Sequence, residues 1–119
     1  MRVLVADDDE DIRFVVGSIL GRHGWQVTFA ASGSAAIDLL GVPASYDVVV
    51  LDQNMPPGSG LEVIEWLRAA GDPTPAVLFT GFVSAIDHAA AATHGVAVLD
   101  KVAIKQLPAV LEELIRPGA

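Results

Sequence analysis

The sequence predicts a doubly wound α/β domain, in which helices cover both faces of a parallel sheet. Continuous apolar runs at 3–6, 48–51, 76–79 and 96–99 contain almost no polar residues, as is typical of strands buried on both faces. Segments with helical spacing of apolar residues alternate strictly with these runs, which implies right-handed crossovers. A length of 119 residues, of which 52% are hydrophobic, suits one domain with a substantial core.

The first half of the chain is expected to supply three strands and two helices. The run 3–6 forms the first strand, and 25–30 forms a more polar strand that lies nearer an edge. Segment 34–40 is the second helix, and 48–51 is the third strand. The first helix is marked by Ile12, Val15, Val16, Ile19 and Leu20, which keep helical spacing.

The second half continues the same alternation. A helix is expected at 61–70, a strand at 76–79, an alanine-rich and weakly patterned helix at 84–93, and a strand at 96–99. The tail 116–119 should end the last helix, so residues 1–119 are expected to form a single domain without repeats or linkers. That last helix is marked by Ile104, Leu107, Leu111, Leu114 and Ile115.

Composition excludes several classes of protein. The net charge of −8 works against direct nucleic-acid binding, which needs clustered Lys and Arg, and favours cationic partners. No cysteine is present, so disulfide frameworks and thiolate metal sites are excluded. The run 3–6 is too short for a signal peptide, and no segment is long enough to span a membrane. We therefore expect a cytoplasmic protein without membrane contact.

Polar residues stand at the carboxyl ends of four expected strands. Ligands of open parallel sheets bind beyond those ends, so side chains placed there should converge on one edge. Taken singly, each has an ordinary explanation as a turn residue, a helix-start acid or a solvated side chain. Their conjunction at separate strand ends is what indicates a site. The residues are Asp7 and Asp8 after the first strand, Asp52 after the third, Thr80 after the fourth and Lys101 after the fifth.

These residue types suggest a metal-assisted reaction with an anion. Neighbouring carboxylates disfavour one another's ionisation, and a hard cation with oxygen ligands, of which Mg²⁺ is the natural choice, removes that conflict. Lys101 supplies a positive charge and Thr80 a hydrogen-bond donor for an anionic group. Asp52 is then left as a carboxylate nucleophile that can accept a phosphoryl group.

The same residues resemble the receiver domain of two-component response regulators, over essentially the whole chain. The resemblance implies a flavodoxin-like fold with strand order 2-1-3-4-5. It also implies that a histidine kinase or phosphotransfer protein phosphorylates Asp52, which shifts the conformation for signalling to a downstream protein; whether phosphorylation also drives formation of a dimer is left open. The matching residues are Asp7-Asp8, Asp52, Asn54-Met55-Pro56, Gly60, Thr80-Gly81 and Lys101.

The resemblance also implies a role for each site residue. Asp8 would bind Mg²⁺ directly and Asp7 mostly through water, with Asp52 and the backbone carbonyl of Asn54 as further ligands. Thr80 would follow the phosphoryl oxygens, and Lys101 would pair with them. The domain would not be an enzyme in the ordinary sense, because it would catalyse only its own phosphorylation and dephosphorylation.

Two other site types fail on particular residues. An EF-hand loop beginning at Asp7 would need Gly where Ile12 stands and Glu where Ser18 stands. A phosphatase of the haloacid dehalogenase type would need a second Asp at the position of Asn54.

A third alternative remains open, namely a receiver-like interaction module that phosphorylation does not regulate. It rests on two departures from the family pattern, which concern signal output. Val102 replaces the usual proline after Lys101, so we expect a trans peptide bond or visible strain there, and Val98 replaces the usual aromatic residue. The segment 95–101 also looks about one residue short.

Overall fold

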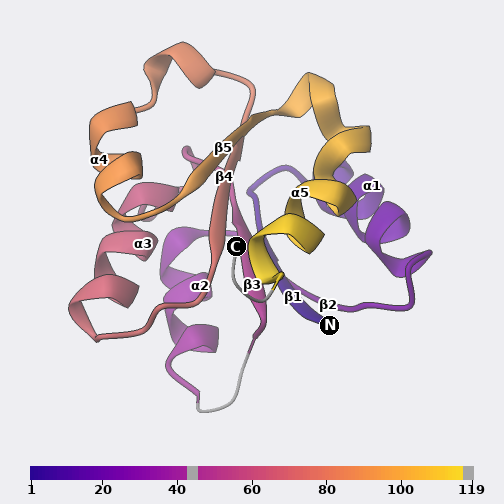
Figure 1. Cartoon of the computed structure of the whole chain (residues 1–119), viewed down its shortest axis with the longest axis horizontal. Coiled ribbons are helices and arrows are strands. Elements are labelled where there is room, and N and C mark those ends of the chain that lie inside the picture. Colours follow the sequence, from indigo (N-terminus) through magenta and orange to yellow (C-terminus); the bar gives the residue numbers. More distant parts are fainter. Residues whose placement is uncertain (43–45, 117–119) are drawn as a thin grey trace.

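The computed structural model describes residues 1–42 and 46–116, which form one five-stranded parallel sheet of order β2-β1-β3-β4-β5 (Figure 1). This confirms the predicted doubly wound, flavodoxin-like α/β fold. The strands are β1 (Arg2–Ala6), β2 (Gln26–Ala30), β3 (Val48–Leu51), β4 (Ala76–Thr80) and β5 (Ala97–Asp100). The helices are α1 (Glu10–Gly21), α2 (Gly33–Leu40), α3 (Gly60–Ala69), α4 (His88–Thr93) and α5 (Leu107–Ile115), with 3₁₀ turns η1 (Val83–Ala85) and η2 (Lys101–Gln106).

The core is divided by the sheet into two layers. Helices α2, α3 and α4 cover one face and α1 and α5 cover the other (Figure 1). Successive side chains of a strand point to opposite faces, so both faces of a continuous apolar run are buried. On β1, Leu4 joins the first layer, whereas Val3 and Val5 join the second, and all three are at most 1% exposed.

The register of the strands brings their carboxyl ends to one level. Ala6 pairs with Leu51, so Asp7 and Asp52 follow at the same height on neighbouring strands. The backbone continues this ladder past the strand ends, because Asp52 N–H donates to the Ala6 carbonyl at 2.9 Å. On the other side, Thr80 pairs with Asp100, which directly precedes Lys101.

Four helices begin at a side chain that accepts a hydrogen bond from the first turn, as helix N-caps do. Asp9 accepts from Asp11 N–H and Ile12 N–H, so this acid belongs to the start of α1. The equivalent caps of α2, α3 and α4 are Ser32, Ser59 and Asp87. None of the helices in 1–42 and 46–116 is long and apolar enough to cross a bilayer.

Two helix boundaries differ from the sequence prediction. The helix expected at 84–93 is α-helical only from His88, because Asp87 caps Ala90 N–H and so starts a new helix after η1. Residues 101–106 form a 3₁₀ turn, and α5 starts at Leu107 with Pro108 in its first turn, where a missing N–H costs nothing. Helix α5 ends at Ile115, and the rest of the predicted tail, 117–119, lies outside the described residues.

Candidate functional site

Three carboxylates meet at the carboxyl ends of β1 and β3. Asp7, Asp8 and Asp52 each offer an oxygen, and these oxygens all lie within 4.8 Å of one another. Asp7 and Asp52 are buried, at 2% and 7% exposure, whereas Asp8 is exposed. The cluster therefore has two carboxylates fixed in the protein and one that faces solvent.

Asp7 is held by contacts with β2 and with the start of α1. The Asp7 N–H donates to the carbonyl of Ala30 in β2 at 3.0 Å, and Asp7 Oδ1 accepts from Asp9 N–H at 2.9 Å. Arg13 Nη1 donates to the Asp7 backbone carbonyl at 2.7 Å. The sequence analysis missed Arg13, and its position six residues after Asp7 carries no motif by which it could have been found.

Lys101 lies between the two buried carboxylates. Its Nζ is 2.7 Å from Asp7 Oδ2 and 3.4 Å from Asp52 Oδ2. Asp7 Oδ2 is buried and accepts no hydrogen bond of good geometry from the described residues, so the ion pair with Lys101 compensates its charge. A buried carboxylate left without such compensation would be strongly destabilising.

Burial and neighbouring charges set the pKa of the two central groups. Burial, together with the charge of Asp7, raises the pKa of Asp52 above its ordinary value, although Lys101 and the Gln53 backbone act in the opposite direction. Burial alone would lower the pKa of Lys101, but its close contact with Asp7 and the charges of Asp7 and Asp52 outweigh burial and raise it. Lys101 is therefore held as a cation, whereas ionised Asp52 is only partly compensated.

The loop after Asp52 is tied to the start of α3. Gln53 accepts Gly60 N–H on its backbone carbonyl at 3.2 Å and Leu61 N–H on its side-chain Oε1 at 3.0 Å. A Cβ on Gly60 would lie 2.5 Å from the Asp52 carbonyl oxygen and 2.7 Å from Leu78 Cδ2. Only glycine lets α3 approach this closely, so Gly60 helps to position the backbone of Asp52.

Two predicted site residues are at the same edge but make other contacts. Thr80 ends β4, is 1% exposed, and accepts Phe82 N–H on its hydroxyl at 3.2 Å. Asn54 is exposed in the β3–α3 loop and forms an isolated antiparallel bridge with Ser59. The structure thus brings Asp7, Asp8, Asp52 and Lys101 together directly, whereas no recorded contact joins Thr80 or Asn54 to them.

The donor set fits a divalent metal with a preference for oxygen. Three carboxylates share the site with a single ammonium, and the raised pKa of Asp52 shows that burial and the charge of Asp7 leave its charge incompletely balanced. Mg²⁺ prefers one or two carboxylates and keeps several waters, and the exposed Asp8 gives such a hydrated ion a route to the cluster. Asp7, Asp8 and Asp52 are the side chains that would hold it.

The segment after Lys101 follows the prediction made for Val102. The Lys101–Val102 peptide bond is trans, since the cis peptide bond in the described residues joins Pro56 and Pro57. Val102 is 90% exposed, and its N–H donates to Asp100 Oδ1 at 2.9 Å. Val98 is half-buried in the core layer that α2, α3 and α4 cover.

Comparison with known proteins agrees with this geometry. Residues 3–111 match the family model of the response regulator receiver domain. The chain is 40% identical over 80 residues to the response regulator MprA of Mycolicibacterium vanbaalenii, which covers 67% of this chain but 34% of that protein. Over 80 residues it is 34% identical to the transcriptional regulatory protein DltR of Streptococcus agalactiae, covering 67% of this chain and 35% of that protein. These matches thus span about a third of each curated relative.

Solved structures give the same result over nearly the full length. The Francisella response regulator 1452 receiver domain is 28% identical, with a TM-score of 0.86 over 96% of this chain and 95% of that one. The response regulator TrrA of Thermotoga maritima, solved in complex with Mg²⁺ and BeF, is 26% identical, with a TM-score of 0.84 over 95% and 97% of the two chains. The chain therefore belongs to the receiver-domain family of two-component response regulators.

Proposed function

We propose that this receiver domain is switched by phosphorylation of Asp52, with Mg²⁺ bound by Asp7, Asp8, Asp52 and the backbone carbonyl of Asn54. The observation that carries the proposal is the placement of a buried carboxylate at a strand end, 3.4 Å from Lys101 Nζ and within a cluster of three acids. A strand end presents the nucleophile rigidly, and the neighbouring cation favours its approach to an anion.

The transfer itself balances without a further reactant. A carboxylate oxygen of Asp52 forms a bond to phosphorus while the bond between phosphorus and the donor's histidine nitrogen breaks. The imidazole leaves with the electron pair of that bond. Bound Mg²⁺ would neutralise charge on the transferred group, and Lys101 and Thr80 would then contact its oxygens.

The proposed partners follow from this chemistry. The donor would be a histidine kinase or histidine phosphotransfer protein in the cytoplasm, and the signal would pass to a downstream protein or a phosphorylation-dependent dimer. The domain, taken as residues 1–119, would catalyse only its own phosphorylation and dephosphorylation. Direct nucleic-acid or membrane contact is not part of the proposal, because the net charge is −8.

Intact-mass measurement tests the proposal. The protein is incubated with Mg²⁺ and a small acyl-phosphate donor, and we expect the mass of one phosphoryl group to be added. The matched control is Asp52→Asn, which keeps the size of the side chain and removes the nucleophile. Equal modification of the control, or modification that persists after chelation of the metal, would contradict the assignment.

A pair of acidic residues tests the metal site separately. Asp8 belongs to the cluster, whereas Asp11 lies in the first turn of α1. We expect Asp8→Ala to weaken Mg²⁺ binding by at least roughly tenfold, as loss of a ligand does, and Asp11→Ala to weaken it much less. Titration of both variants by calorimetry measures this, and equal losses would show a diffuse acidic field without a site.

A receiver-like interaction module without regulation by phosphorylation is the second candidate. It is favoured by the replacement of the usual output residues with Val98 and Val102. The same mass measurement separates the two candidates if the module is not phosphorylated on Asp52. If Asp52 is phosphorylated, hydrogen exchange separates them, because the module predicts unchanged amide exchange in β5 and α5.

A further inference from the structure

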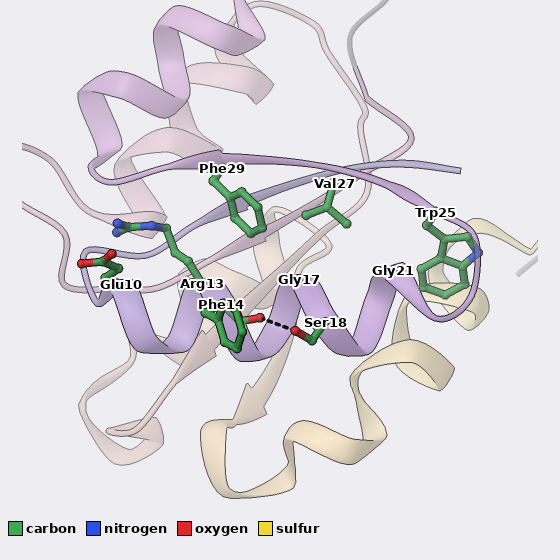
Figure 2. A pocket seen from close by; sticks show the side chains of 9 residues that line it. All are labelled: Glu10, Arg13, Phe14, Gly17, Ser18, Gly21, Trp25, Val27 and Phe29. Carbon is green, nitrogen blue, oxygen red and sulfur yellow. Dashed lines mark hydrogen bonds between the residues drawn. The ribbon is translucent and has the colours of Figure 1, made fainter.

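An open groove runs between helix α1 and the edge strand β2 (Figure 2). Val27 and Phe29 point from β2 toward α1, while Glu10 and Arg13 lie at one end of the groove and Trp25 at the other. These residues lie outside the acidic cluster, although Arg13 also donates to the Asp7 carbonyl, and the proposed function does not use the groove.

The floor of the groove is made by small residues of α1. A Cβ on Gly17 would lie 2.6 Å from Phe29 Cζ, so glycine lets this ring rest on the helix backbone. Gly21 has nothing within 4 Å of the place where its Cβ would be. The Ser18 hydroxyl turns back to donate to the Phe14 carbonyl at 3.0 Å (Figure 2), which uses the one donor of this side chain within its own helix.

A large apolar side chain stands immediately beside this small-residue floor. Phe14 is 74% exposed and Phe29 is 43% exposed. Phe14, Gly17, Ser18 and Gly21 are spaced i, i+3, i+4 and i+7, so they form one stripe along α1. The stripe therefore has the projecting ring of Phe14 at one end. At the other end, Gly21 leaves an open space, which we call the notch.

We propose that this stripe is a self-association surface, on which α1 of a second copy packs antiparallel. A two-fold axis between positions 17 and 18 pairs positions whose numbers sum to 35. It places Phe14 opposite Gly21 of the second copy and Gly17 opposite Ser18 of the second copy. Each ring then enters the other copy's notch, as expected of an isologous interface.

Charge selects a second copy, in this orientation, as the occupant. The first turn of helix α1 is net acidic, with Glu10 and Asp11 against Arg13, and Arg22 follows the last turn. An antiparallel pair sets each acidic end beside the basic end of the other copy, and it also opposes the two helix dipoles. A parallel pair would place like charges together. The complementarity is satisfied twice, because both copies contribute the same two ends.

The expected dimer is weak. A helix of 12 residues is about 18 Å long at 1.5 Å per residue, which limits the interface to the small end of the range for specific contacts. We therefore expect a dissociation constant on the order of 10⁻⁴ M. Because no residue of the acidic cluster takes part, the association does not require phosphorylation and can fail or succeed independently of the proposed function.

Disulfide cross-linking gives the sharpest test, because the chain has no cysteine. Ser18→Cys puts one thiol beside the proposed axis, and Ser34→Cys puts one on the exposed surface of α2 as the matched control. Under mild oxidation near the expected dissociation constant, we expect the Ser18→Cys protein to form covalent dimers and the control to remain largely monomeric. Equal cross-linking of the two proteins would overturn the proposal.

Sedimentation measurements of the dimer, made on variants that fill the notch or remove the Phe14 ring, complete the test. Gly21→Gln adds a side chain where the monomer has open space and raises helix propensity, so it should preserve the fold while blocking the ring of Phe14. We expect Gly21→Gln and Phe14→Ser each to weaken the dimer by at least roughly tenfold, as loss of a central anchor does. Phe82→Ser, which removes a ring of similar exposure elsewhere, should have no effect. Wild-type protein that stays monomeric at about ten times the expected dissociation constant would overturn the proposal and leave the groove to a different chain.

Discussion

Strands β3 and β5 both deliver a charged residue to the site, but they are packed very differently. Every residue of β3 is buried, and Asp52 directly follows it. Every residue of β5 is only half-buried, and Lys101 follows it at the start of a 3₁₀ turn. Strand β3 lies in the middle of the sheet between β1 and β4, whereas β5 is an edge strand beside the six-residue helix α4 (Figure 1).

This difference in packing places the carboxylates of the site on a rigid part of the fold and Lys101 on a part that can move more easily. The acids sit where the backbone is held by a central strand, by Asp9 and Arg13 contacts to Asp7, and by the close approach of α3. Lys101 sits on the segment that buries less apolar surface, and regions of low packing open at lower free energy. A new anion at Asp52 would compete for Lys101 with Asp7, so a change is expected to travel along β5 and η2 while β3 stays fixed.

The largest effect should come from Gly60→Ala, which attacks the fixed side. The added methyl group would lie 2.5 Å from the Asp52 carbonyl oxygen, so α3 must move away. We expect a loss of about 3 kcal/mol in the free energy of unfolding, as overpacking of a core position causes. Gly81→Ala is the control, because its Cβ meets nothing within 4 Å. Urea unfolding measures both, and equal midpoints would contradict the tight packing of α3.

A pair of valine truncations compares the two strands directly. Val50 on β3 is 1% exposed, whereas Val98 on β5 is half-buried. We expect Val50→Ala to cost about 2 kcal/mol and Val98→Ala about 1 kcal/mol, in proportion to the packing that each loses. Chemical unfolding of the two variants decides the matter, and a larger loss from Val98→Ala would reverse the proposed difference between the strands.

A smaller effect is expected from Asp52→Asn, with a characteristic pH dependence. Burial and Asp7 raise the pKa of Asp52 in the fold, so the contribution of protonated Asp52 to stability is present below its unfolded pKa and is lost as pH rises through the folded value. Without metal, we therefore expect the variant to be more stable than wild type at pH 7, by on the order of 1 kcal/mol, and the advantage to fade below pH 4. Thermal unfolding across this range measures it. A variant that is less stable at pH 7 would show that Lys101 more than compensates the charge.

The sequence predicted the sheet well because continuous apolar runs such as 48–51 leave little choice of structure. It also placed Asp7, Asp8, Asp52 and Lys101 at one edge, since parallel strands end at one level, and these four lie together there, whereas Thr80 makes other contacts. Helix boundaries and side-chain contacts that depend on local hydrogen bonds were harder to predict. Asp87 interrupts the alanine-rich helix by capping Ala90 N–H, and the 3₁₀ turn before Pro108 shortens α5. The contact of Arg13 with the Asp7 carbonyl depends on how the β1–α1 turn folds, which no spacing of residues reveals.

The most direct test is amide hydrogen exchange, measured with and without beryllofluoride and Mg²⁺ as a phosphoryl mimic. It compares β3, which precedes Asp52, with β5 and η2, the segment that carries Lys101. We expect amide protection to change across β5 and η2, residues 97–106, and to stay the same in β3. The Lys101→Met variant should lose most of the change, because the charge that couples the anion to this segment is gone. A change of equal size in β3, or none in β5 and η2, would contradict the proposed separation of the two strands.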